Sequence, residues 1–472
     1  MSGPARGRVP EPGRGASVLV AALSSAFGVV LLSATGFIDA LVRADPVLGD
    51  SATVTVVLSI MAVILVGLAV YVGAVVTANT FATIVAGRTR QIAMLRLIGA
   101  SARSQRAAVA REGLWVGAVG AACGLVAGTA LSALGVAAFE AQPAIADVGY
   151  GVARPVLLVP AAVVVLTTWL AAWVGARPVL SVAPLEALGA AVPRPHGDRV
   201  RRPVRTAAAV ALFAVGGMLL AAGILLGLVS PLGVVVAFFG GILSFTGLVL
   251  GAALVMPPVL RAVGYLFGTS VPARLAAQNA LRYPERSSRT AIGVVIGVTL
   301  VTMFAVALET VKAVLTAAAD GEDVPGLDAA IDTFSVVMMG LIGVSALIAA
   351  VGVVNLLTLG VSQRRRELGL LRALGLSTPQ VRLVVLLEAA HVTVAAVLTG
   401  LVLGIAYGWA GAQSLLGSVP TVSGHAAFVW PAVPAVPIAV IVLAAALLTL
   451  VAASAPSRLA TRISPVAALA EG

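Results

Sequence analysis

The residues best suited to carry chemistry in this 472-residue chain lie in a basic segment that occurs twice. Residues 88–101 read RTRQIAMLRLIGAS, and residues 364–377 read RRRELGLLRALGLS. Matched positions differ by a constant 276 (364 − 88), and this register also pairs Asn79 with Asn355 and Glu112 with Glu388. The identical positions inside the segment include Arg88 and Arg364, Leu95 and Leu371, Arg96 and Arg372, Gly99 and Gly375, and Ser101 and Ser377.

Helical spacing gives each copy an apolar ridge with charged flanks. The ridge consists of Met94, Leu95 and Ile98 in the first copy and of Leu368, Leu371 and Leu374 in the second. Gly99 and Gly375 can end these helices, and Ser101 and Ser377 can begin the next ones as N-caps. An ordinary basic loop that touches lipid head groups would not need one repeated pattern, so the sequence favours docking of a partner.

Two further pairs of polar residues flank the segments. Asn79 and Asn355 are expected about two turns inside the membrane, where such side chains hydrogen-bond between helices for roughly 1 kcal/mol. Their role is either structural or a relay of motion. Glu112 and Glu388 are expected in the first turns of their helices, complementing the helix N-terminus or pairing with arginines of the repeated segments. A proton relay is the alternative for the two carboxylates.

The composition requires these segments to lie between membrane helices. The chain is 60% hydrophobic and 10% charged, with a mean hydropathy of +1.09, whereas soluble domains carry about 25% charged residues. Apolar runs of 20 or more residues can cross the hydrocarbon layer as helices. We expect ten spans, at residues 17–39, 53–84, 105–139, 154–176, 206–229, 232–260, 290–312, 332–361, 382–416 and 430–454.

The distribution of charge fixes the expected topology. All lysines and arginines except Arg43, Arg154 and Lys312 fall on one side of these spans, and the aspartates gather on the other. By the positive-inside rule both termini are cytoplasmic. The excess of arginine over lysine is typical of GC-rich coding and favours a bacterial source, so we expect the bacterial cell membrane. The net charge of +11 is therefore a topology signal, and nucleic acid is not expected as a partner.

The repeat predicts an all-α polytopic protein with a 4 + 2 + 4 arrangement of spans. Six spans separate equivalent positions, so the two four-helix units are parallel rather than inverted. Glycines at every fourth residue, Gly120, Gly124 and Gly128 and again Gly400, Gly404 and Gly408, are expected to pack helices closely. The expected parts are a cytoplasmic tail (1–16), a first unit (17–188), a linker with spans 5 and 6 (189–269), an interfacial elbow helix (270–289) and a second unit (290–472).

No catalytic or cofactor site is expected in this chain. It has no G-x-x-x-x-G-K-[ST] motif, and Lys312 is its only lysine. Cys123 is its single cysteine, and His196, His391 and His425 are too scattered for a metal site.

The paired motif resembles the FtsX-like permease family, the membrane subunits of MacB-type ATP-binding cassette (ABC) systems. The second copy matches that family's pattern through Asn355, Arg364, Glu367, Leu371, Arg372, Gly375, Ser377 and Glu388. The first copy departs from it at Gln91, where Glu is usual, and at Leu97, where Ala is usual.

The resemblance implies a transmembrane permease subunit whose coupling helices, 88–101 and 364–377, dock on a separate ATPase. ATP and Mg²⁺ would bind that ATPase, in two copies. The docking residues would be Arg88, Gln91, Leu95, Arg96, Ile98, Arg364, Glu367, Leu371, Arg372 and Leu374, with Asn79, Glu112, Asn355 and Glu388 coupling within the membrane. The work done would be export, extraction or mechanical signalling at the outer leaflet, with an extracytoplasmic partner protein as one possible target.

Two other classes of function remain open from the sequence. A non-transporting scaffold could regulate an outer partner such as a cell-wall hydrolase. An ion-coupled carrier would need ionisable residues near the bilayer midplane, and the expected spans are nearly free of them.

Overall fold

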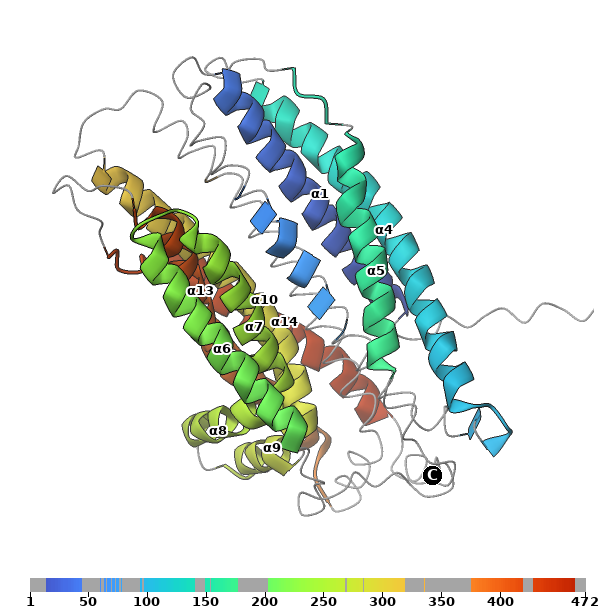
Figure 1. Ribbon diagram of the computed structural model, residues 1–472. Coiled ribbons are helices and arrows are strands. Elements are labelled where there is room, and N and C mark those ends of the chain that lie inside the picture. Colours follow the sequence, from blue (N-terminus) through green and yellow to red (C-terminus); the bar gives the residue numbers. More distant parts are fainter. Residues whose placement is uncertain are drawn as a thin grey trace, which may run out of the picture. The chain divides into compact units, whose positions relative to one another are not determined.

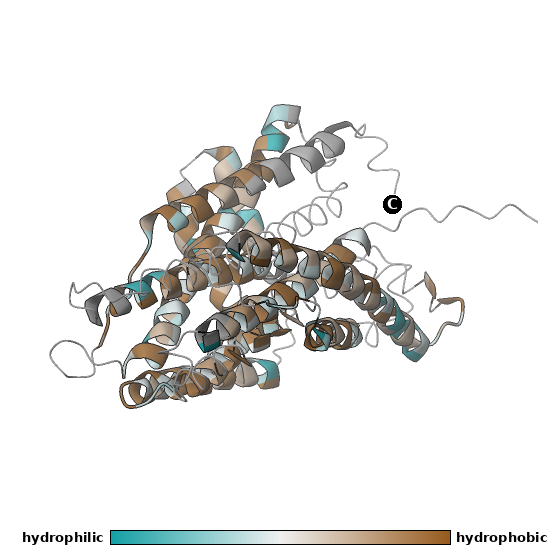
Figure 2. Cartoon of the chain, turned by 90° about the horizontal axis from the view of Figure 1, so that it is seen from above, coloured by the Kyte–Doolittle hydropathy of each residue, from teal (hydrophilic) through white to brown (hydrophobic). Residues whose placement is uncertain are grey.

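The computed structural model describes most of the predicted spans as helices. It covers residues 14–44, 97–140, 149–152, 154–176, 203–267, 270–282, 284–318, 335, 375–418 and 428–462, with isolated positions between 60 and 95. These residues form helices and connecting turns and no strand, and seven of the helices are long and apolar enough to cross a membrane. Hydrophobic residues dominate the helices in Figure 2. The prediction of an all-α polytopic membrane protein is confirmed.

The contacts divide the chain into two units, one made of residues within 1–33 and 68–191. This first unit contains most of α1 (Arg14–Ala44), followed by α4 (Ala102–Glu140), η1 (Pro155–Leu157) and α5 (Leu158–Gly175). Ala21 of α1, Ala121 of α4 and Ala161 of α5 are buried against one another, and the Ser25 hydroxyl donates to the carbonyl of Ala121 at 3.1 Å. Small side chains therefore bring three helices together around one core.

The second unit comprises residues within 34–67 and 192–472 and is built around two helices, α10 (Pro284–Ala318) and α13 (Thr378–Leu416). Helix α13 contacts every other major helix of this part of the chain, as Figure 1 shows for α6, α7 and α10. Those helices are α6 (Pro203–Gly227), α7 (Gly233–Leu250), α8 (Ala252–Gly264), α9 (Val271–Arg282), α10 and α14 (Ala435–Arg462). A short turn, η5 (Tyr265–Phe267), follows α8.

The repeat in the sequence is reproduced in the helices. Helices α4 and α13 both have 39 residues, and both their first and last residues differ by 276 (378 − 102 and 416 − 140). Gly124 faces Ala22 of α1, and Gly400 faces Val298 of α10, which is again 276 residues further on. The glycine ladders thus pack against equivalent positions of α1 and α10, as predicted.

Helices α6 to α8, which lie between the repeats in the sequence, pack on α13. Gly227 at the end of α6 contacts the backbone of Ser414, and the hydroxyls of Ser244 and Tyr407 are hydrogen-bonded at 3.0 Å. The buried His391 donates through Nε2 to the carbonyl of Leu260 in α8, at 2.6 Å. These helices are therefore part of the second unit.

A membrane-crossing helix is present within the predicted span 232–260, but it ends at Leu250, because the helix breaks at Gly251. Helix α7 ends at Leu250, and α8 begins at Ala252 and contains Pro257 and Pro258. Pro257 and Pro258 lack the N–H groups that would donate to the carbonyls of Ala253 and Leu254, which disfavours α8 as a continuation of the span through lipid. Both prolines lie after the break at Gly251. The chain instead turns, and α8 lies with α9 at one end of the helices of this unit (Figure 1).

Other helix boundaries also differ from expectation. A separate helix, α9, is present where the amphipathic elbow was predicted, and it ends at Arg282. Helix α10 begins at Pro284, because proline is favoured in the first turn of a helix, and its membrane-crossing part, Ala291–Val314, agrees with the predicted span 290–312. Helix α14 begins at Ala435 rather than at residue 430. Most of the expected span 53–84 and, apart from Ser335, all of span 332–361 lie outside the described residues.

The glycine contacts predict an asymmetry between two positions on α4. A Cβ at position 124 would meet the Ala22 carbonyl oxygen at 2.2 Å, whereas a Cβ at position 135 would meet nothing within 4 Å. We expect Gly124→Ala to lower the free energy of unfolding by about 1–3 kcal/mol through overpacking. Gly135→Ala should be neutral or stabilising by up to about 1 kcal/mol. Thermal unfolding of both variants in detergent checks this, and equal behaviour would contradict the packing.

Candidate functional site

The first repeated segment presents an exposed apolar surface at its end. Met94, Leu97 and Ile98 are exposed, with Ile98 at 82%, whereas Leu95 is half-buried. Sequence reasoning placed Met94, Leu95 and Ile98 on one side and missed Leu97. Leu97 could have been found from its three-residue spacing from Met94, which puts these two side chains on neighbouring turns of one helix face.

A rigid reversal follows this surface. Gly99 has φ = +102°, a conformation that strongly favours glycine, and the N–H of Ala100 donates to the carbonyl of Leu95 at 3.0 Å. This six-to-one hydrogen bond is the Schellman helix ending. Ser101 then caps α4, because its Oγ accepts the N–H of Ser104 at 3.0 Å. Gly99 as the C-cap glycine and Ser101 as an N-cap are both confirmed.

The second copy repeats this geometry where the structure describes it. Gly375 has φ = +100°, and Ser377 caps α13 in a reciprocal arrangement with Gln380. The Ser377 N–H donates to Oε1 of Gln380 at 2.9 Å, and the Gln380 N–H donates to the Ser377 hydroxyl at 3.5 Å. Both segments are therefore joined to their 39-residue helices by the same glycine–serine turn.

The remaining predicted site residues fall into two groups. Glu112 and Glu388 each lie ten residues after the first residue of their helix, about 15 Å along the axis, rather than in the first turn as predicted. The helix dipole acts within the first turn, so it does not explain these carboxylates. Outside the described residues lie Asn79, Arg88, Gln91, Arg96, Asn355, Arg364, Glu367, Leu371, Arg372 and Leu374.

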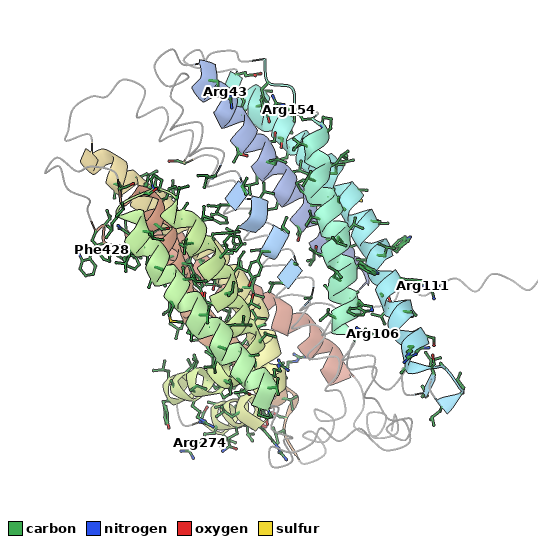
Figure 3. All side chains as sticks on the ribbon, viewed as in Figure 1. Arg43, Arg106, Arg111, Arg154, Arg274 and Phe428 are labelled. Atoms are coloured by element: carbon green, nitrogen blue, oxygen red, sulfur yellow. The ribbon has the colours of Figure 1, made fainter. Side chains whose placement is uncertain are left out.

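An arginine that sequence reasoning missed connects the start of α4 with the end of α5. The guanidinium of Arg106 lies 3.7 Å from the centre of the Trp173 ring, and its Nε donates to the Trp173 carbonyl at 3.1 Å. Figure 3 shows Arg106 beside the last turn of α5. Arg106 therefore joins the last turn of α5, through the Trp173 ring and carbonyl, to a helix that starts at the repeated segment.

The second unit also has a contact between the helix after its repeated segment and its last helix, but at a different level, because Thr393 corresponds to Gly117 and the counterpart of Arg106 is Arg382. Position 173 corresponds to Thr449 of α14, whose hydroxyl is hydrogen-bonded to Thr393 of α13 at 2.9 Å. Both contacts join the helix after the repeated segment to the last helix of its unit. They use a cation and a ring in one unit, and two hydroxyls in the other.

The Arg106–Trp173 contact predicts a measurable coupling energy. In a double-mutant cycle with Arg106→Ala and Trp173→Leu, unfolding in detergent should give a coupling of about 0.5–1 kcal/mol from the cation–π contact. Arg111→Ala, on the same helix, is the matched control and should change stability by less than about 0.5 kcal/mol. Additive effects of the Arg106 and Trp173 substitutions would show that the contact contributes nothing.

Among the described residues, no three of His, Cys, Asp and Glu come close enough together to hold a metal ion. The arrangement is suited to transmit motion rather than to bind a metal ion. It consists of an exposed apolar ridge, a fixed turn, and a long helix that is packed closely on its neighbour.

Comparison with known families agrees with the repeat. A family described as FtsX-like permease C-terminal matches the chain twice, at residues 63–182 and 339–465. The first match contains α4 and α5 and the second contains α13 and α14, so each covers one copy of the same helical arrangement. No curated protein matches the chain. The two matches together cover more than half of the sequence, and the chain belongs to the FtsX-like permease family.

Proposed function

We propose that this chain is the transmembrane subunit of an ABC system in which separate ATPase subunits dock on residues 88–101 and 364–377. One ATPase would bind each segment, so a single chain would seat an ATPase dimer. ATP and Mg²⁺ would be held by those subunits. The membrane subunit would convert closure of the dimer into work at the opposite face, as export, as extraction, or as mechanical signalling to an outer protein.

The observation that carries this proposal is the shared geometry of the two copies. Each has a glycine with positive φ, a serine cap two residues later, and a 39-residue helix that begins at the next residue. A lipid-contacting loop has no need of a fixed turn, whereas a docking element must hold its ridge at a set angle to the helix that it moves.

The long helices are suited to carry such a motion across the bilayer. At 1.5 Å per residue each is about 58 Å long, well over the ~30 Å of the hydrocarbon core. Their glycine ladders leave no room for independent sliding, because the nearest backbone atoms of α1 and α10 lie directly against them. Displacement of the Ser101 or Ser377 turn would therefore move the packed helices together.

The expected orientation places the repeated segments and both termini in the cytoplasm of a bacterial cell. Support comes from the segregation of arginine toward the side of the repeated segments. In that orientation the ATPase meets the ridge directly from the cytoplasm, and the C-terminal ends of α4 and α13 face outward.

The docking proposal predicts loss of the ATPase on charging the ridge. We expect Ile98→Asp with Leu374→Asp, its equivalent 276 residues later, to reduce co-purification of the ATPase encoded beside this gene. Truncating an interface anchor costs about 2 kcal/mol or more, so retention should fall at least about tenfold. Ile98 is exposed, and the first substitution should leave the fold intact.

Val229→Asp is the matched control for this experiment. Val229 is 83% exposed in the turn between α6 and α7, near the C-terminal rather than the N-terminal end of α13. It should leave ATPase binding unchanged. Equal binding by the wild type and the double variant would exclude these segments as the docking site, and absence of ATPase binding in the wild type would favour the scaffold hypothesis.

A further inference from the structure

Residues 428–432 of the second unit, which we name the clamped segment, are fixed by three side chains from α10 and α13. Trp409 Nε1 donates to the carbonyl of Val429 at 2.6 Å, and the Val429 N–H donates to Oε1 of Gln413 at 2.8 Å. The Ala432 N–H donates to the Thr310 hydroxyl at 3.3 Å. Thr310 and Gln413 are fully buried, so this polar contact is built into the core.

The three side chains that hold the clamped segment have no counterparts at the matched positions of the first repeat. Subtracting 276 from Thr310, Trp409 and Gln413 gives Ala34, Ala133 and Ala137. Three alanines cannot make these hydrogen bonds. The first unit therefore shares the helices of the second but lacks the side chains that fix the segment before its last helix.

The clamp holds two aromatic residues outward. Trp430 is 82% exposed, and Phe428 is about half exposed while its ring packs edge-on against Trp409, with the centroids 5.2 Å apart. Figure 3 shows the Phe428 side chain pointing away from the helices. Buried hydrogen bonds thus fix this segment while the Trp430 ring stays exposed. This arrangement suits contact of the ring with something outside the chain.

The exposed face of α14 indicates whether the Trp430 ring meets lipid or water. Val436, Val440, Leu443 and Leu447 are exposed at spacings of four, three and four residues, which makes one apolar stripe along the helix. Val433 and Trp430 are also exposed, and both lie in the non-helical residues directly before α14. In a membrane protein such a stripe faces lipid, so Trp430 lies where the hydrocarbon ends.

We propose that Trp430, held by the clamp, is an interfacial anchor that binds phospholipid head groups at the face opposite the repeated segments. Tryptophan suits this layer because its ring is apolar while its N–H needs a polar partner. The anchor would fix the depth of α10 and α13 in the bilayer. This proposal does not depend on ATPase docking, since it rests on the membrane character of the chain.

The two units would then differ in their hold on this leaflet. The first unit has Arg154 at the position of Trp430, and its guanidinium lies 4.3 Å from the centre of the Tyr150 ring. Arg154 therefore makes its cation–π contact within its own unit. The second unit would be the one fixed to the lipid surface by an uncovered ring.

Depth-dependent quenching tests the anchor in the full chain. The chain has five tryptophans, and Trp115, Trp169 and Trp173 are replaced by Phe, leaving Trp409 and Trp430. The emission lost on adding Trp430→Phe is assigned to Trp430. The protein is placed in phosphatidylcholine vesicles with bromine either near the head group or near the chain ends. We expect the shallow bromines to quench at least about half of the Trp430 emission, and the deep bromines much less.

Each other outcome overturns the proposal. Stronger quenching by the deep bromines would place the ring within the hydrocarbon as an ordinary span residue. Quenching by aqueous iodide alone would place it in water, where a protein partner would be the remaining candidate for this surface. Neither outcome would bear on ATPase docking, which is measured separately.

A second variant tests the clamp itself. Gln413→Ala removes the acceptor for the Val429 N–H, so the segment should loosen and the ratio of shallow to deep quenching should fall toward one. Gly411→Ala is the matched control on the same helix, because a Cβ there meets nothing within 4 Å. An unchanged ratio in Gln413→Ala would show that the clamp does not position the ring.

Discussion

The structure depends on close backbone contact between helices that cannot rely on the hydrophobic effect to associate. In lipid, apolar side chains gain little by leaving the surrounding tails, so helices associate through tight packing and hydrogen bonds. Glycines at every fourth residue of α4 and α13 provide that packing against α1 and α10. Each pair of helices is thereby joined over several turns, and a displacement at one end reaches the other.

The duplication gives two such pairs, but the units have become different. The helices between the repeats pack on α13 through Ser414, Tyr407 and His391, so that α13 is enclosed more fully than α4. The contact between Arg106 and Trp173 in the first unit and the hydroxyl pair of Thr393 and Thr449 in the second lie at different levels of their helices. The side chains of the clamp are alanines at the matched positions of the first repeat. These differences suit a machine in which one half is fixed more firmly than the other.

Much of this organisation could be predicted from local patterns. The glycine–serine turns, the elbow helix and the glycine ladders follow from spacing and capping rules that act within a few residues. The break at Gly251 could also have been found, because Pro257 and Pro258 within an apolar run already argued against a continuous span. Placing Glu112 and Glu388 in a first turn was wrong, because both already lie beyond the first turn of the predicted spans and the serine caps start the helices still earlier.

The contacts between distant segments could not be predicted. Arg106 and Trp173 are 67 residues apart, and Thr310 and Ala432 are 122 apart, so that no periodicity relates them. That the first repeat lacks the clamping side chains can be recognised only once the hydrogen bonds of the second unit are known. Three alanines in an apolar helix carry no signal of a missing contact.

The central claim is that each repeated segment moves as one body with its long helix when an ATPase closes. The most direct measurement is the distance between spin labels at positions 107 and 383 in a Cys123→Ser background, with a second pair at 107 and 135 within the first unit. Both 107 and 383 are exposed, lie near the start of the long helices and are outside the docking ridge. With the partner ATPase bound, ATP should shorten the distance between 107 and 383 and leave the distance from 107 to 135 unchanged. An unchanged distance between 107 and 383 during ATP hydrolysis would contradict the account.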